Sequence, residues 1–244
     1  MRPLSTADLL AVWDLAANQP PARRTLALLA ACSDQSAQEG VVELSIGQGD
    51  ERLLALREQI FGPRLASISS CPACNETLEF EVNTSDLRLS SDPKSVASIE
   101  MEYADYRLRF RLPNVLDIAN LEPAAGVEIN RQRLLSCCLL SARRDDINIS
   151  AGDLPPDVVI AIADRMAQAD PQADVQFALT CPQCGHEWSA SFDIGSFVWS
   201  ELNAHAIRLL NDVHVLASAY GWNEAEILSM SPARRQAYVE LATR

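Results

Sequence analysis

The fold is decided by a short stretch that occurs twice, first as Cys71-Pro72-Ala73-Cys74-Asn75-Glu76-Thr77-Leu78 and again as Cys181-Pro182-Gln183-Cys184-Gly185-His186-Glu187-Trp188. Residues of alternating polarity flank both copies, at 65–68 and 78–82 around the first and at 175–179 and 188–192 around the second. Side chains alternate between the two faces of a β-strand, so each copy predicts a strand, a tight turn and a second strand. The cysteines are then expected on the two turns.

Two cysteines separated by two residues on a reversing turn supply two of the four thiolates that a structural zinc ion requires. Each copy is therefore half of a site, and a closed tetrahedral centre needs both. The residue after each second cysteine needs a positive φ, which Gly185 adopts freely and Asn75 tolerates. We predict one shared structural Zn²⁺ ion in a zinc ribbon, with the ligands Cys71, Cys74, Cys181 and Cys184.

The long segment between the two copies does not argue against a shared ion. Loop closure costs only about 0.6 kcal/mol more per doubling of loop length, whereas structural zinc contributes on the order of 10 kcal/mol of apparent folding free energy. Two separate sites, or none, remain as alternatives. A thiol–disulfide centre is another, but each pair leads into a strand pattern and lacks the helix N-terminus that lowers a cysteine pKa. His186 could replace a cysteine ligand, although a place beside the turn is the simpler interpretation.

The composition is that of a globular, acidic protein. The 244 residues are 48% hydrophobic and carry a formal net charge of −13. Nucleic-acid binding is not expected, because a basic surface normally supplies the affinity for phosphates. No apolar run is long enough to cross a membrane and no cleavable signal is recognisable, so we expect a soluble cytoplasmic protein. The odd number of cysteines, seven, does not favour a disulfide framework. The three outside the repeat are expected to be small core residues: Cys32, Cys137 and Cys138.

The whole pattern predicts an α+β protein in five segments. Residues 1–64 form an N-terminal helical segment with one short strand at 41–46, and residues 65–90 form the first half of the zinc ribbon. An inserted lobe at 91–170 combines a hairpin at 99–112 with helices near 114–121, 128–142 and 156–168. Residues 171–195 form the second half of the ribbon, and residues 196–244 form a helical C-terminal segment.

Capping signals mark several helix boundaries. Ser5 and Asp8 have the spacing of a capping box at the start of the first helix. In the C-terminal segment, apolar residues recur every three or four positions up to Tyr220, and Gly221 is placed to end that helix. Asn223 and the Ser231-Pro232 pair are placed to begin two further helices.

No catalytic motif stands out in the sequence. The segment 46–50 lacks the lysine and the spacing of a phosphate-binding loop, and the carboxylates are scattered. His205 and His214 match no metal-ligand spacing. We therefore expect a protein that is not an enzyme.

Three blocks of sequence carry a family resemblance. They are 44–61 with the first cysteine pair, 109–114 with Asp117, and the block from Cys181 to Tyr238, which includes 181–188, 192–202, 209–217 and 220–222. These blocks resemble the T-even-phage-type baseplate family, commonly described as baseplate hub assembly chaperones of contractile phage tails and contractile injection systems. The resemblance extends over residues 40–244 and is most specific from residue 181 onward.

The resemblance implies an interaction role. Such a protein would bind a baseplate hub or spike protein and help it to assemble, as a chaperone or as a structural subunit that remains in the particle. Aromatic residues dominate interface hot spots, so four of them are candidate partner contacts, with core packing as the alternative. These residues are Trp188, Trp199, Tyr220 and Trp222. The oligomeric state is left open.

Overall fold

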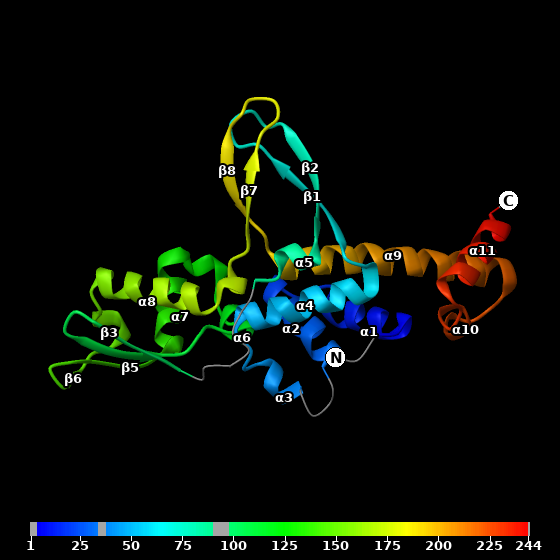
Figure 1. The fold of residues 1–244 in the computed structure, drawn as a ribbon. Coiled ribbons are helices and arrows are strands. Elements are labelled where there is room, and N and C mark those ends of the chain that lie inside the picture. Colours follow the sequence, from blue (N-terminus) through cyan, green and yellow to red (C-terminus); the bar gives the residue numbers. More distant parts are fainter. Residues whose placement is uncertain (1–3, 34–37, 90–97, 244) are drawn as a thin grey trace.

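The computed structural model describes residues 4–33, 38–89 and 98–243. The chain forms a helical body, a lobe of helices and strands, an arm of two hairpins that rises from the body, and two short helices at the C-terminal end (Figure 1). The prediction of a mixed helix-and-strand protein is therefore confirmed. None of the described helices is both long and apolar enough to span a membrane.

The body is built from four helices, α1 (Thr6–Ala16), α2 (Pro21–Cys32), α4 (Ile46–Phe61) and the first part of α9 (Ile194–Tyr220). They bury a common core that includes Leu28, Leu54 and Leu202. The predicted capping box of α1 is confirmed, because the Ser5 hydroxyl accepts a hydrogen bond from the amide of Asp8. This bond satisfies an amide that the first turn of a helix leaves without a partner.

The strand predicted at 41–46 is wrong. The short helix α3 (Gln38–Val41) occupies the start of this segment, and Ser45 is the N-cap of α4. The hydroxyl of Ser45 accepts a hydrogen bond from the amide of Gln48, and the Gln48 side chain accepts one from the Ser45 amide. This capping box begins a helix where the apolar residues alone indicated an extended segment. An isolated bridge between Ser45 and Asn114 is the strand-like pairing that remains in this described segment.

The lobe packs helices against an antiparallel sheet with the strand order β3-β4-β5-β6. Its elements are β3 (Ile99–Tyr103), β4 (Tyr106–Phe110), β5 (Leu139–Arg144), β6 (Ile147–Asn148), α7 (Val127–Cys138) and α8 (Pro156–Ala169). The hairpin predicted at 99–112 is confirmed, with Ala104 in its turn at a φ of 50°. Phe110, Leu135 and Ile162 belong to a second core, separate from that of the body.

The helix predicted at 128–142 ends early, at Cys138. From Leu139 the chain continues as β5, which pairs with β4. Leu139 and Leu140 continue the apolar spacing of the helix, so periodicity alone cannot distinguish the two structures. The edge of β4 offers backbone hydrogen bonds that an extended segment can complete, and the strand therefore replaces the last helical turn.

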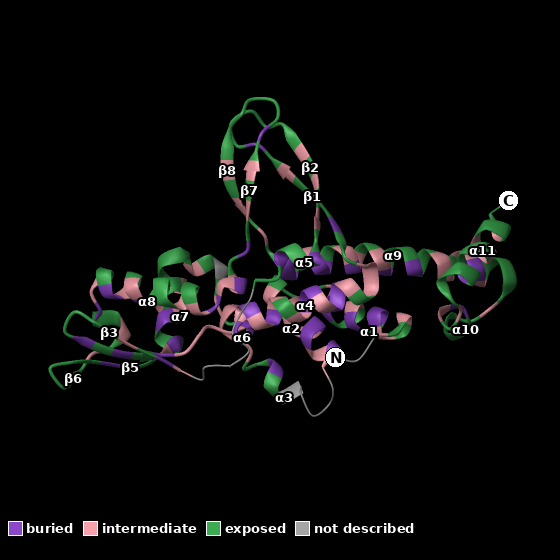
Figure 2. Cartoon of the chain, in the orientation of Figure 1, coloured by how far each residue is buried: buried purple, intermediate pink, exposed green. Residues whose placement is uncertain are grey.

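The arm consists of two antiparallel hairpins, β1 (Arg64–Ser70) with β2 (Thr77–Asn83), and β7 (Gln176–Thr180) with β8 (Glu187–Ser191). Both predicted strand–turn–strand units are confirmed. Residues along the strands alternate between exposed and half-buried, apart from the buried Leu65 in β1, and most of the arm is open to solvent (Figure 2). An isolated two-stranded hairpin is marginally stable at best, so each hairpin needs further support.

Short elements complete the fold: α5 (Thr84–Leu87), α6 (Val115–Ala119), α10 (Glu224–Leu228), α11 (Pro232–Ala242) and 3-10 turns at Pro123–Ala125, Ala151–Asp153 and Pro171–Ala173. The C-terminal boundaries are confirmed, because Gly221 ends α9 at a φ of 69° and Asn223 and Ser231 cap the next two helices. Cys32 and Cys138 are buried as predicted, whereas Cys137 is exposed. The division into five domains stays a prediction.

Candidate metal centre

Both cysteine pairs lie at the tip of the arm, in the turns that join β1 to β2 and β7 to β8 (Figure 1). In the first turn, the amide of Cys71 donates to the carbonyl of Glu76 at 2.8 Å, and the amide of Asn75 donates to the carbonyl of Cys71 at 2.9 Å. The second turn repeats both bonds at 2.9 Å, from Cys181 to His186 and from Gly185 to Cys181. The sequence repeat is therefore a repeat of backbone structure as well.

The predicted positive φ angles are present in both turns. Asn75 has a φ of 61° and Gly185 a φ of 72°. Glycine reaches this region without steric cost, and asparagine does so more readily than most other residues. These two residues let each turn reverse the chain directly after its second cysteine.

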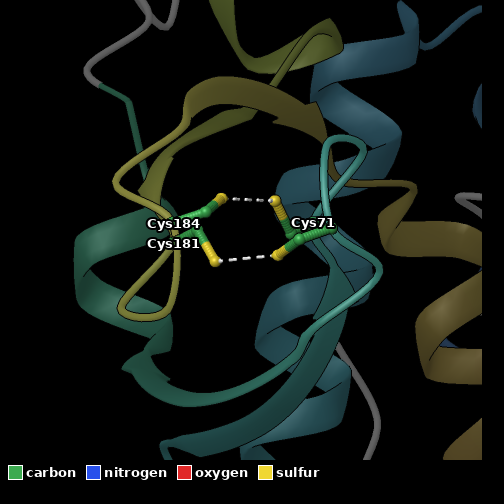
Figure 3. Close-up of side chains that lie close together, drawn as sticks. Cys71, Cys181 and Cys184 are labelled. Atoms are coloured by element: carbon green, nitrogen blue, oxygen red, sulfur yellow. Dashed lines mark hydrogen bonds between the residues drawn. The ribbon is translucent and has the colours of Figure 1, made fainter.

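The four cysteine sulfurs converge on one point between the turns. The Sγ atoms of Cys71 and Cys184 are 3.7 Å apart and those of Cys74 and Cys181 are 3.6 Å apart (Figure 3). All four Sγ atoms lie within 4.8 Å of one another. The prediction that the two distant pairs meet is confirmed.

The spacing of the sulfurs fits a tetrahedral zinc ion. A Zn–S bond of about 2.3 Å places the sulfurs of a regular tetrahedron about 3.8 Å apart, close to both measured separations. A set of four thiolates leaves no position open for water or substrate, which is typical of a structural site. Among the described residues, this is the one group of three or more histidine, cysteine or acidic side chains that could share a metal ion.

Backbone amides favour ionisation of the first cysteine. Desolvation opposes the thiolate of Cys71, but the amides of Ala73 and Cys74 and the neighbouring thiols donate to its sulfur and lower its pKa to about 7. The amide of Glu76 favours the thiolate of Cys74, yet desolvation and the three neighbouring sulfurs outweigh it and raise that pKa to about 12. Four thiolates this close together repel one another. A bound cation that replaces the thiol protons would offset this repulsion.

The pKa of Cys184 is raised, like that of Cys74. The amide of His186 and the thiol of Cys74 favour its thiolate, but desolvation and the sulfurs of Cys181 and Cys71 raise its pKa overall. His186 itself is not among the clustered donors and stacks on Trp188, with ring centroids 6.1 Å apart. The histidine therefore lies beside the turn.

Aromatic contacts join the two hairpins below the cysteines. The ring of Phe80 on β2 meets the ring of Phe177 on β7 edge to face, with centroids 5.2 Å apart. Phe177 also contacts Phe192, which contacts Phe197 in the first turn of α9. This chain of rings connects the arm to the core of the body, since Phe177, Phe192 and Phe197 pack against that core. The sequence did not reveal these contacts, because the pairing of the rings depends on how the two hairpins face each other.

The four aromatic residues considered for partner contact are scattered over the fold. Trp188 is half-buried in the arm, and Trp199 is 7% exposed in the core of the body, with the guanidinium of Arg24 5.1 Å above its ring. Tyr220 and Trp222 stack at the end of α9, with centroids 4.6 Å apart, and Tyr220 is 39% exposed. The burial of Trp199 favours core packing as its role.

A comparison with known protein families identified a match. Residues 8–199 match the family described as the T4 bacteriophage base plate protein. This chain belongs to that family. The match includes the lobe, the complete arm and all four clustered cysteines of this baseplate-family protein. It begins before residue 40 and ends in α9, so the predicted resemblance is confirmed while its extent is corrected at both ends. Searches of curated proteins and of solved structures gave no significant match.

Proposed function

We propose that this protein is a non-enzymatic assembly factor for the baseplate hub or spike of a contractile phage tail or a contractile injection system. The observation that carries the proposal is the family match over residues 8–199. The arm supports it, because a pair of hairpins that stands out from the body offers an extended surface to another baseplate component. We propose that it acts in the cytoplasm.

A structural zinc ion is part of the proposal. Cys71, Cys74, Cys181 and Cys184 would hold it, which would complete a zinc ribbon from two distant halves. The sulfur separations and the all-thiolate donor set support this assignment. An ion there would fix the tip of both hairpins, and a closed ligand set offers no position for catalysis.

The partner is proposed to contact the arm and the end of α9. Trp188, Tyr220 and Trp222 keep exposed surface, and large aromatic side chains supply contact area at a small cost in side-chain entropy. The ring of Tyr238 meets Tyr220 and Trp222 at 5.9 and 4.9 Å and completes this C-terminal cluster. Trp199 is left out of the proposed surface because it is buried.

Co-expression with the hub and spike proteins of the same tail tests the proposal. We expect the tagged protein to capture one of them, and we expect purified mature particles to lack it. Its presence in particles at a fixed stoichiometry would instead identify a structural baseplate subunit. Capture of neither protein would reject both versions. A Tyr220→Ala, Trp222→Ala variant tests the C-terminal cluster, with the exposed Leu15→Ala as its matched control.

A thiol redox protein is the second candidate, because two Cys-x-x-Cys pairs lie close together and turn amides favour the thiolate of Cys71. A redox centre predicts that iodoacetamide modifies Cys71 rapidly at neutral pH in the protein as purified. Zinc ligation predicts protection of all four cysteines until a chelator removes the ion. The exposed Cys137 serves as an internal reference for the reaction in both cases.

A further inference from the structure

A cavity of about 380 Å³ lies where the body meets the base of the arm. Its walls come from the first turns of α2 and α4, from α6, from the segment before β7 and from the junction of β8 with α9. Its volume falls within the range of about 300–1,000 Å³ typical of ligand pockets. Apolar side chains, among them Ile46, Val115 and Phe192, form part of the lining.

Close packing of the surrounding helices fixes the walls. A Cβ atom on Gly195 would lie 2.5 Å from the hydroxyl oxygen of Thr25, so a side chain there would require the threonine to move. At Gly49 of α4, an added Cβ atom would lie 3.3 Å from side-chain carbons of both Leu29 and Val115, so this position is also tightly enclosed. The cavity is therefore bounded by packed helices on the side of the body.

Three carboxylates line the cavity: Asp50, Asp174 and Asp193. Two of them have partners within the protein. Asp193 caps α9 by accepting hydrogen bonds from the amide and hydroxyl of Ser196, and Asp174 accepts one from the side chain of Gln176. Among the described residues, Asp50 has no hydrogen-bond or ion-pair partner.

The described surroundings of Asp50 hold negative charge. Burial, followed by the charges of Asp193 and Asp170, raises the pKa of Asp50 to about 7, and no basic group in the described part of the chain lowers it. Asp50 is half-buried. A half-buried carboxylate without a partner costs stability, and such groups concentrate at binding sites. None of the described residues that line the cavity is basic, so a ligand can supply the missing positive charge.

A metal ion is not the ligand that this geometry favours. The described acidic residues around the cavity do not form a group close enough to share one ion. The carboxylates are separated from one another, so an organic cation that spreads its charge over several N–H donors matches them better than a single metal ion. We propose that the cavity receives an arginine side chain of a partner polypeptide, whose guanidinium pairs with Asp50 and lies against the apolar wall.

Arginine fits this cavity better than lysine. Its planar guanidinium is more weakly hydrated than an ammonium group, carries five N–H donors and stacks on aromatic faces such as that of Phe192. The net charge of −13 attracts a basic segment, whereas it repels phosphate ligands. We assign the arginine to a baseplate component, and this assignment rests on the proposed function.

An NMR titration with N-acetyl-arginine amide tests the site without a partner. We expect saturable shifts of the backbone amides at 174–175 and 194–196, which border the cavity. The Asp50→Asn variant should bind the probe at least about tenfold more weakly, since a charge-assisted hydrogen bond is lost. The neutral isostere N-acetyl-citrulline amide should bind wild type as weakly. Glu51→Gln, an exposed position on the same helix, should bind like wild type.

Equal binding of the arginine probe by wild type and Asp50→Asn, or no shift at these amides, would overturn the inference. Capture of hub and spike proteins by the same variants separates it from the proposed function. If the probe binds through Asp50 but no baseplate protein is captured, the site stands and the proposed function fails. If wild type and Asp50→Asn capture a partner equally and neither responds to the probe, the function stands and the site fails.

Discussion

Asn75 and Gly185 occupy the same position of the two cysteine turns, both with positive φ. A Cβ atom in this left-handed region costs about 1–2 kcal/mol, which asparagine partly avoids and alanine does not. We expect Gly185→Ala to weaken zinc affinity about tenfold, as measured by competition with a chromophoric chelator. Asn75→Gly should bind zinc at least as tightly as wild type. Gln183→Ala, in the same exposed turn, is the control, and unchanged affinity in Gly185→Ala would contradict the turn geometry.

Asp50 makes a separate prediction about pH. Its pKa in the folded protein, about 7, lies above the ordinary value of 3.8, so the ionised carboxyl opposes folding. Stability should therefore fall as the pH rises from about 4 to about 7 and stay low above that range. Asp50→Asn should stabilise the protein at pH 8 by up to about 4 kcal/mol and change little near pH 4. Urea unfolding at both pH values checks this, and a destabilised variant at pH 8 would refute it.

At the scale of elements, an ion pair with a buried arginine joins α4 to α9. The guanidinium of Arg57 donates to both carboxylate oxygens of Glu201, at 2.8 and 2.9 Å, and its side chain is 3% exposed. Arg57→Ala leaves the Glu201 carboxylate, 27% exposed, without its cation and also removes the hydrogen bond from Arg57 to the Gly62 carbonyl. We expect it to cost about 2 kcal/mol in denaturant unfolding. The double variant Arg57→Met, Glu201→Met should recover much of this loss.

The exposed pair between Arg107 and Glu102 provides the matched control. Both side chains are largely open to solvent, at 76% and 80%, and Arg107→Ala should cost less than about 1 kcal/mol. Equal losses for Arg57→Ala and Arg107→Ala would show that burial does not set the strength of these pairs.

Helices and turns were predicted correctly where the local sequence carried a signal for only one kind of structure. The capping box of Ser5, the glycine stop at Gly221 and the two cysteine turns are set by neighbouring residues, and all of them form as expected. Segments with two competing signals were not predictable. At Ser45 a cap overrode an extended pattern, and at Leu139 pairing with β4 overrode a helical one. Both outcomes depend on what the rest of the chain brings alongside.

At the scale of the whole molecule, two distant hairpins share one tip and leave the folded segment between them as a lobe (Figure 1). Equivalent cysteine turns revealed this meeting in the sequence, because half a zinc site requires its other half. No such signal exists for the cavity at Asp50, whose walls come from five separate parts of the chain. The phenylalanine contacts between the hairpins were hidden for the same reason.

Removal of zinc should destabilise the two hairpins of the arm and leave the body and the lobe folded. The body and the lobe have their own apolar cores, whereas the hairpins depend on the tip and on the rings of Phe80 and Phe177. We expect a chelator to accelerate hydrogen exchange in β1, β2, β7 and β8 and to leave α4 and the buried part of α9 protected. Faster exchange throughout the chain, or no change in the arm, would contradict this division.

The metal content of the purified protein tests the shared centre most directly. Inductively coupled plasma mass spectrometry should find one zinc ion per chain, and Cys71→Ser and Cys181→Ser should each lose it, because both halves hold the same ion. A protein without stoichiometric zinc would contradict the account, and so would two ions per chain of which each variant loses only one.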